Sequence, residues 1–296
     1  MSLPQRIKSY FDVAVAMDYD GPSKAHPIIV LNALKNIIGD NRNNPSQKLL
    51  DSMANKSEIY PQRTDDQKVL DRVAKDGLGQ TVFISDLEDA CQSGNSLRME
   101  IEAARINCVS ENGLGGLEVL SEVALQDYDR FGIFVYHLQR SNVFQRDKEN
   151  TWPYTRCLLK EIAKSSLPEP HEKMDQRSEI MGQVPTDSSE LSQIAAARRL
   201  WEGDYVRING YRRELSHWFS KLNVEGEKMI NKKTVDVLLD YVQNGGNYFI
   251  ELAENLIKTT GWEAKIIQLE ALRFYAKNTS LKDLPTILSH LEVIIS

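Results

Sequence analysis

Apolar residues recur every three or four positions over most of this chain, and that spacing constrains the fold more than any other feature of the sequence. Leu97, Ile101, Ala104 and Cys108 show the pattern, each three or four residues after the one before. A helix of 3.6 residues per turn brings side chains at these intervals onto one face. The sequence therefore predicts a series of amphipathic helices.

Short polar and glycine signals mark where these helices start and stop. Asn44-Pro45 reads as an N-cap followed by a first-turn proline. Capping-box spacing, in which two side chains satisfy free amides of the first turn, occurs three times, in Thr64/Gln67, Ser85/Glu88 and Asp187/Glu190. Glycines that can adopt a positive φ follow the periodic segments. These glycines are Gly39, Gly77, Gly94, Gly113, Gly245 and Gly261.

The predicted fold class is all-α, a multi-helix bundle or irregular helical array in two regions. The interval 165–186 contains three prolines and few large apolar residues, so it is interpreted as a linker between residues 1–164 and 187–296. The most regular period, from Leu191 to Leu222, predicts one long helix. Gly203 and Gly210 inside it either admit a closely packed neighbour, which we favour, or break it in two. Further helices are expected near residues 230–243, 248–258, 262–277 and 282–295.

Composition favours a soluble cytoplasmic protein. The three cysteines are far apart and odd in number, so they predict buried thiols in a reducing compartment. Asp12 interrupts the first apolar stretch, which therefore lacks the uninterrupted core of a signal peptide. No run of eighteen apolar residues occurs, so no membrane partner is expected. The formal net charge of −6 disfavours a nucleic-acid-binding role for the whole surface, although a local basic face remains compatible with it.

Local motifs of enzymes are missing from the sequence. It contains no Gly-x-Ser-x-Gly, His-Glu-x-x-His or kinase signature, and the cluster Gly113-Leu114-Gly115-Gly116 lacks both the strand before it and the lysine of a phosphate-binding loop. We interpret that cluster as a turn between two helices. The favoured function is a non-enzymatic helical interaction or scaffold subunit with a protein partner and no cofactor.

RNA is a possible second partner, because two stretches are basic. The first lies on the predicted long helix and contains Arg198, Arg199, Arg207, Arg212, Arg213 and Lys221. The second, residues 136–156, alternates aromatic rings with cations that include Arg140 and Arg146. The competing interpretations are an ordinary solvated helix face for the first stretch and buried core aromatics for the second.

A metal-dependent oxidoreductase is the alternative function. Glu214 and His217 are three residues apart, so one helix could offer a carboxylate and an imidazole to iron or manganese. His137, Glu118 and Glu122 are candidates for the remaining ligands. A bundle site of this kind needs two such motifs and the sequence has one, which favours a packed or solvated histidine instead.

The C-terminal quarter resembles a known family. Ile230-Asn231-Lys232-Lys233-Thr234-Val235, Leu269-Glu270-Ala271-Leu272-Arg273-Phe274-Tyr275-Ala276 and Leu281-Lys282-Asp283-Leu284 are similar to segments of the small helical subunit of type III CRISPR effector complexes. The resemblance, limited to about residues 230–296, implies a non-catalytic helical bundle that lines guide and target RNA. Lys277-Asn278 stands near the place where that family has an arginine, and this departure from the family pattern counts against direct RNA contact.

Overall fold

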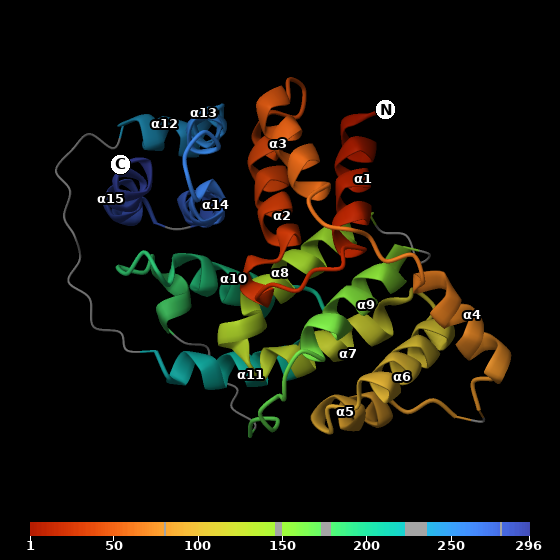
Figure 1. The fold of residues 1–296 in the computed structure, drawn as a ribbon. Coiled ribbons are helices and arrows are strands. Elements are labelled where there is room, and N and C mark those ends of the chain that lie inside the picture. The colour runs from red at the N-terminus through yellow and green to blue at the C-terminus, as the bar shows by residue number, and fades with distance from the viewer. Residues whose placement is uncertain (80, 146–149, 173–178, 223–235, 279) are drawn as a thin grey trace.

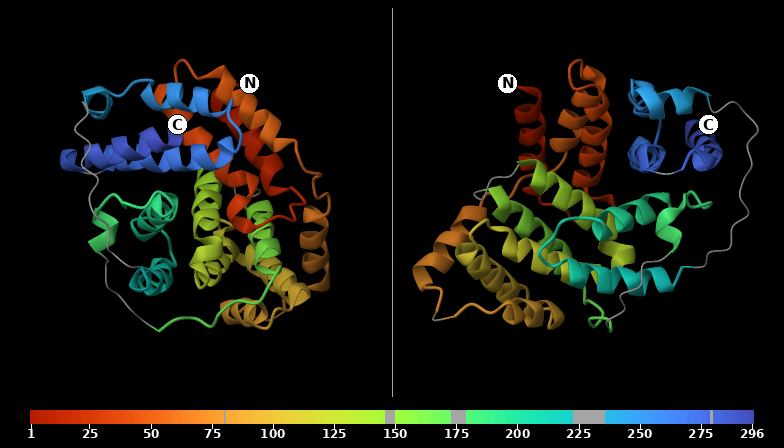
Figure 2. Two further views of the ribbon diagram at one scale, coloured as in Figure 1. Left: turned by 60° about the vertical axis from the view of Figure 1, so that its left-hand side comes forward. Right: turned by 180° about the vertical axis from the view of Figure 1, so that it is seen from behind.

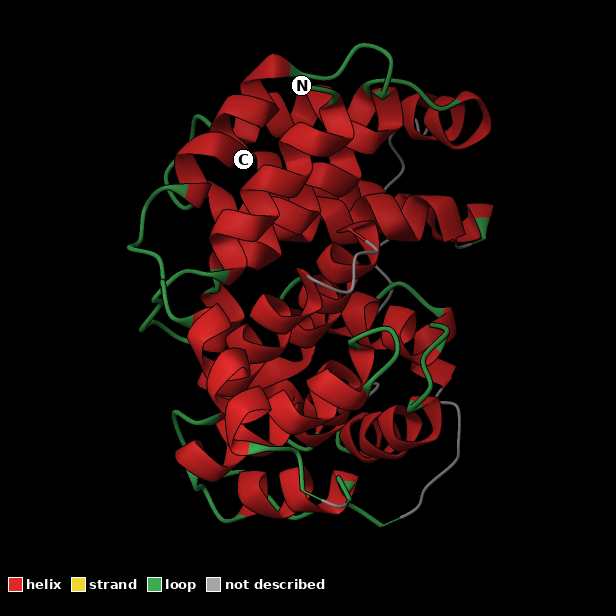
Figure 3. Cartoon of the chain, turned by 90° about the vertical axis from the view of Figure 1, so that its right-hand side faces the viewer, coloured by secondary structure: helices red, strands yellow, loops and turns green. Residues whose placement is uncertain are grey.

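The fold consists of α-helices, as the three-and-four spacing predicts. The computed structural model describes residues 1–79, 81–145, 150–172, 179–222, 236–278 and 280–296. Within these ranges the regular structure is α1–α15 with short 3-10 turns, and the only pairing of β type is an isolated bridge between Met17 and Gln62. Figure 3 shows helices and loops throughout the described chain. None of the described helices has the length and apolar composition needed to cross a lipid bilayer.

The first nine helices build two packed groups. They are α1 (Leu3–Val15), α2 (Pro27–Ile38), α3 (Gln47–Ser57), α4 (Asp66–Asp76), α5 (Ile84–Gln92), α6 (Ser96–Val109), α7 (Leu114–Leu125), α8 (Tyr128–Gln145) and α9 (Thr151–Ile162). In Figure 1, α1–α3 stand above α7–α9, and α4–α6 lie to the lower right. Contacts of α2 with α8, and of α1 with α9, join the upper helices to the lower ones.

The remaining helices complete both groups. They are α10 (Leu191–Trp201), α11 (Ile208–Ser220), α12 (Asp236–Asn244), α13 (Tyr248–Leu256), α14 (Trp262–Asn278) and α15 (Leu284–Ile295). Helix α10 packs on α8 and on α14, and α14 packs on α2 (Figure 2). Buried apolar residues from both sides of the predicted boundary form one hydrophobic core cluster. The division into regions 1–164 and 187–296 stays a prediction.

The interval 165–186, predicted as a linker, packs against the helices at its C-terminal end. Residues 173–178 lie outside the described residues. After the 3-10 turn η4 (Glu179–Gly182), Val184 is buried, and Met181 within the turn is also buried. The carbonyl of Pro185 accepts a hydrogen bond of 2.8 Å from His290 Nε2 of α15. The approach to α10 is therefore fixed by apolar burial and by one buried imidazole.

The prediction of one long helix from Leu191 to Leu222 is wrong. Helix α10 ends at Trp201 and α11 begins at Ile208. The break is stabilised by tertiary contacts that periodicity does not reveal: the backbone N–H of Arg207 donates to Glu118 Oε2 at 3.0 Å, and the Tyr205 ring packs 5.0 Å from that of Tyr211. The close packing that we expected does occur at Gly210, where an added Cβ would lie 2.0–2.4 Å from carboxylate atoms of Glu122.

Helix stops were predicted more accurately than starts. Gly77, Gly94 and Gly245 come just after the ends of α4, α5 and α12 with φ between 68° and 89°, as a helix-terminating glycine requires. Gly39 ends α2 with a φ of −59°, and Gly113 and Gly261 directly precede α7 and α14. Helix α3 is capped by Ser46 rather than Asn44, because the Ser46 hydroxyl accepts from the amide of Leu49. Helix α10 starts at Leu191, and the Asp187 carboxylate accepts from the Ser189 amide in the turn before it. Gly113 lies in a turn between α6 and α7, as expected for the glycine cluster.

We predict that Trp218→Ala lowers the free energy of unfolding by about 3–5 kcal/mol, the cost typical of truncating a buried tryptophan. Trp218 is 4 % exposed, its ring lies 4.2 Å from that of Tyr128, and its Nε1 donates to Asp129 Oδ1 at 2.8 Å. Urea denaturation measures the loss. Phe83→Ala is the control, because Phe83 is 57 % exposed and its loss should stay within about 0.5 kcal/mol. A loss below about 1 kcal/mol for Trp218→Ala would contradict a buried seam between α8 and α11.

Candidate functional site

Arginines and carboxylates from α5, α7 and α11, together with Arg207 just before α11, form a charged constellation, which we call the arginine–carboxylate cluster. Its members are Glu88, Glu118, Glu122, Arg207, Arg213 and Glu214. Arg207 pairs with Glu122 and with Glu88, the latter at 2.6 Å. Arg213 donates to Glu122 at 3.0 Å and to Glu214 at 2.8 Å. Each guanidinium thus bridges two carboxylates.

Two histidines border this cluster. His171 Nδ1 lies 2.6 Å from Glu214 Oε2, and because an ionised carboxylate only accepts, Nδ1 carries the proton of this bond. The His171 ring stacks on that of His217, with centroids 3.4 Å apart and planes within 16°. The pKa of His217 is lowered by burial and then by the nearby His171 and Lys221. His171 was not among the predicted site residues.

The structure brings together four of the five candidate metal ligands, but the carboxylates among them are occupied by arginines or by a backbone amide. Glu122 and Glu214 pair with Arg213, and Glu118 accepts from the amide of Arg207. The fifth candidate, His137, lies on α8, where its Nδ1 accepts from Asn32 Nδ2 at 2.8 Å. Across the described ranges, no group of three or more His, Cys, Asp or Glu has an arrangement that could hold a metal ion.

The arginines predicted for RNA lie at separate places, and most are engaged within the chain. Arg207 and Arg213 belong to the arginine–carboxylate cluster. Arg199 is buried against Glu270, Arg198 pairs with Glu202, and Arg212 donates to the carbonyl of Trp201. Lys221 is exposed at the end of α11. Arg146 lies outside the described residues, and Arg140 lines a pocket described below.

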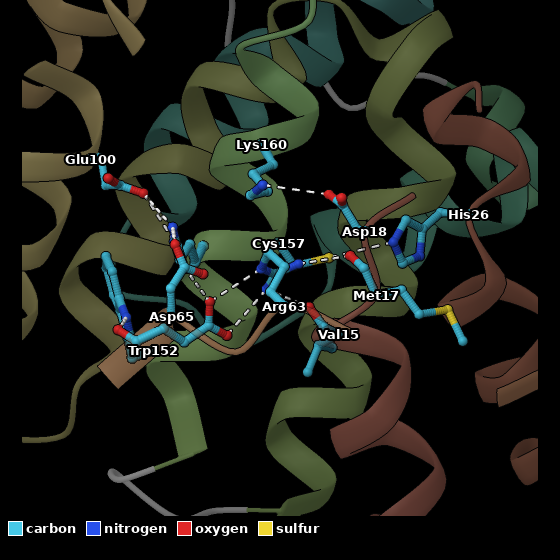
Figure 4. Close-up of polar contacts among 12 residues, drawn as sticks. Val15, Met17, Asp18, His26, Arg63, Asp65, Glu100, Trp152, Cys157 and Lys160 are labelled. Atoms are coloured by element: carbon cyan, nitrogen blue, oxygen red, sulfur yellow. Dashed lines mark hydrogen bonds and ion pairs between the residues drawn. The ribbon is translucent and has the colours of Figure 1, made fainter. Parts of the chain in front are cut away.

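An ion network around the buried Arg156 of α9 holds α4 and α6 in place (Figure 4). Arg156 pairs with Asp65, Asp66 and Glu100, and the pKa of Asp65 falls to about 2, chiefly through its hydrogen bond to Arg156. Arg63 donates to the carbonyls of Val15 and Met17, both at 2.8 Å. These contacts satisfy backbone and carboxylate acceptors, so the network serves to dock helices.

The same region contains a cysteine beside a histidine. Cys157 Sγ lies 3.5 Å from His26 Nε2, as Figure 4 shows. His26 Nδ1 accepts from the amide of Ile28, so Nε2 carries the proton and donates toward sulfur. Burial lowers the pKa of His26 to about 3 and raises that of Cys157 to about 12. Near neutral pH both groups are uncharged, which is the opposite of an activated thiolate–imidazolium pair.

A pocket rich in cations opens where α1, α2, α8 and α14 meet, and we call it the basic pocket. It has a volume of about 420 Å³ and is lined by Lys35, Arg42, Arg140 and Arg273, with Asn36 and apolar residues. Among the residues that the structure describes, no carboxylate lines it. Arg273 is held by Asp40, with N···O distances of 2.6 and 2.7 Å. The side chains of Lys35, Arg42 and Arg140 make no hydrogen bond or ion pair with any described residue.

Lys35 is electrostatically the most perturbed of these cations. Its pKa is lowered from 10.5 to about 7, first by burial and then by the charge of Arg140, with smaller effects of the same sign from Arg199 and Arg273. Glu270 acts in the opposite direction. An anion in the basic pocket would relieve the repulsion among these cations, so the site is suited to a negatively charged ligand.

A buried ion pair is linked to the lining of the basic pocket through Asn36. Arg199 of α10 binds Glu270 of α14 through two bonds of 2.6 and 3.0 Å, and the guanidinium lies 4.1 Å from the centre of the Tyr136 ring. Asn36, which lines the pocket, donates to the same carboxylate at 2.8 Å. The Glu270 side chain is 2 % exposed, and despite its burial the pKa of Glu270 falls to about 2 because of Arg199.

No protein-family model, curated protein or solved structure matches this chain. The resemblance of residues 230–296 to the CRISPR small subunit therefore stays a prediction. Sequence reasoning found Arg140 but missed Lys35, Arg42 and Arg273. One signal was present: Asn32, Lys35 and Asn36 interrupt the otherwise apolar helix Pro27–Ile38, and polar residues on such a helix are more informative than its apolar ones.

We predict that Glu270→Gln lowers the free energy of unfolding by about 3–5 kcal/mol at pH 7, because it leaves the Arg199 guanidinium buried without a counter-charge. The folded-state pKa of Glu270 is below its ordinary value of 4.5, so its contribution is complete above pH 4.5 and is lost as pH falls toward 2. The difference between wild type and variant should shrink over that window.

Urea denaturation at a series of pH values measures this effect. Glu254→Gln is the matched control, since Glu254 pairs with the exposed Lys48 and its loss should cost at most about 1 kcal/mol. Equal losses for the two variants would show that the Arg199–Glu270 pair contributes no more than a surface pair.

Proposed function

We propose that this chain is a non-enzymatic helical subunit that binds single-stranded RNA through the basic pocket. The observation that carries the proposal is the convergence of Lys35, Arg42 and Arg140 on one pocket. These three cations make no hydrogen bond or ion pair with a described residue, and no described carboxylate lines the pocket. Contacts to phosphates supply much of the affinity for nucleic acids, and they come chiefly from lysine and arginine. A protein partner, expected from the sequence, stays a prediction.

The distribution of charge supports this choice of surface. The predicted face on α10 and α11 contains more arginines, but Arg199, Arg207 and Arg213 are neutralised by carboxylates, which are Glu88, Glu122, Glu214 and Glu270. Binding a phosphate there would require one of these pairs to break, which would leave a largely buried carboxylate such as Glu122 without its counter-charge. Arg140 and Arg42 are exposed, and a phosphate can bind to them without breaking an ion pair between described residues.

Binding also fits the described side chains better than catalysis does. The pair Cys157–His26 is uncharged near neutral pH, and the carboxylates of the arginine–carboxylate cluster are already bonded. A general base or a metal centre needs lone pairs that face a substrate or an ion. We therefore propose the binding role in place of the oxidoreductase alternative.

We predict that Arg140→Gln weakens binding of a fluorescein-labelled oligoadenylate of about eight nucleotides by roughly fivefold to tenfold. Fluorescence anisotropy between about 50 and 200 mM salt measures the dissociation constant. Loss of one phosphate contact should also reduce the slope of log Kd against log salt by about 0.7.

Lys221→Gln is the control for this experiment. It removes one exposed positive charge on α11, outside the basic pocket, and should change Kd by less than about twofold. Absence of salt-dependent binding would overturn the proposal. A larger effect of Lys221→Gln than of Arg140→Gln would instead place the RNA on the helix face predicted from the sequence.

A further inference from the structure

The basic pocket has an apolar wall beside its cations. Leu3, Pro4 and Ile7 of α1 line it together with Phe144 near the end of α8. Phe144 is 37 % exposed, whereas Phe11 beneath it is fully buried. The two ring centroids are 5.9 Å apart and the planes are perpendicular, so Phe11 fixes the orientation of a ring that is partly open to solvent.

Cations adjoin this ring from two helices. Arg140 and Phe144 are four residues apart on α8, and side chains at this spacing are neighbours on one helix face. From α2, Lys35 Nζ lies 5.4 Å from the centre of the Phe144 ring. The pocket therefore presents positive charge next to a flat aromatic surface. A matching ligand has an anionic group adjacent to a flat, apolar one.

We infer that the basic pocket binds a nucleoside phosphate, with the phosphate at Lys35, Arg42 and Arg140 and an unpaired base stacked on Phe144. The inference rests on the proposed function and adds the recognition of the base. Stacking accepts any base, because every base has a π-face. The volume of about 420 Å³ is within the range of pockets that enclose small ligands, and a base inside a duplex has no free face to offer.

An aliphatic carboxylate is the competing ligand, since it also joins an anion to an apolar body. The apolar lining of the pocket is interrupted by Asn36, Arg42 and Arg273. A long alkyl chain would have to lie against these polar groups, whereas the ribose and the edges of a base can hydrogen-bond with them. The lining therefore favours the nucleoside phosphate.

Phe144→Leu tests this inference, because leucine retains apolar contact but offers no ring for stacking. We expect it to weaken binding of the labelled oligoadenylate roughly tenfold, and we expect Phe144→Trp to retain binding. Phe83→Leu is the control, since Phe83 is an exposed phenylalanine on a different part of the chain. Thermal denaturation checks that each variant is folded.

Competition with unlabelled probes identifies the ligand. Displacement of the labelled strand by AMP would support the inference and identify a free nucleotide as a ligand. Displacement by unlabelled oligoadenylate but not by AMP would support it and identify a strand as the ligand. Oligoadenylate binding that is unchanged in Phe144→Leu but weakened in Arg140→Gln would overturn the base contact and leave the proposed function standing. Displacement by octanoate but not by AMP would overturn the inference and identify an aliphatic carboxylate as the better ligand of the pocket.

We further predict that oligoadenylate binding weakens above pH 7, by up to about tenfold per pH unit. A phosphate binds better to the charged form of Lys35, which is lost as pH rises through its pKa of about 7. The neighbours Arg42, Arg140, Arg199 and Arg273 stay charged. Glu270 and His137, with pKa values of about 2 and 3, do not titrate near neutrality.

Lys35→Arg provides the matched variant for this pH series, because arginine remains protonated throughout. It should flatten the dependence of Kd on pH between 6 and 9. The variant also distinguishes an effect of Lys35 on Kd from an effect of the α-amino group of Met1, which precedes the pocket residue Leu3 by two positions. A pH dependence that persists in Lys35→Arg would contradict the role of Lys35.

Discussion

The buried pair Arg199–Glu270 is the interaction on which the rest of the structure depends. It joins α10 to α14, and through Asn36 and Tyr136 the same charges reach α2 and α8. These four helices pack on one another, and three of them line the basic pocket. Removing one charge would leave the other unpaired in a site with little water, so the pair fixes the position of α14 relative to α2.

The chain uses most of its central arginines to join helices. Arg156 connects α9 with α6 and the start of α4, and Arg207 and Arg213 connect α11 with α5 and α7. A protein with a net charge of −6 has enough carboxylates to neutralise such arginines. The basic pocket is the exception, because its described lining gathers Lys35, Arg42 and Arg140 and contains no acidic residue. Its positive potential is therefore local and does not follow from overall composition.

Sequence alone predicted the fold class and most helices, because periodicity and helix caps act over a few residues. It failed where distant residues decide the outcome. The break at Gly203 depends on Glu118, which accepts from an amide 89 positions away, and Glu88 pairs with Arg207 across 119 positions. Arg140 and Phe144 were identified as a cation and an aromatic ring, but their pocket also needs Lys35 from α2 and Arg273 from α14. Charge counting along one helix overestimated the basic face, because Glu88, Glu122 and Glu270, which pair with Arg207, Arg213 and Arg199, come from other helices.

The central claim is that anions bind where α1, α2, α8 and α14 meet. A crystal structure of the protein with a short oligoadenylate tests this most directly. The account predicts a phosphate oxygen within about 3 Å of Lys35 Nζ and of the Arg140 guanidinium, with a base parallel to the Phe144 ring. A strand bound along α10 and α11, with nothing in the basic pocket, would contradict it.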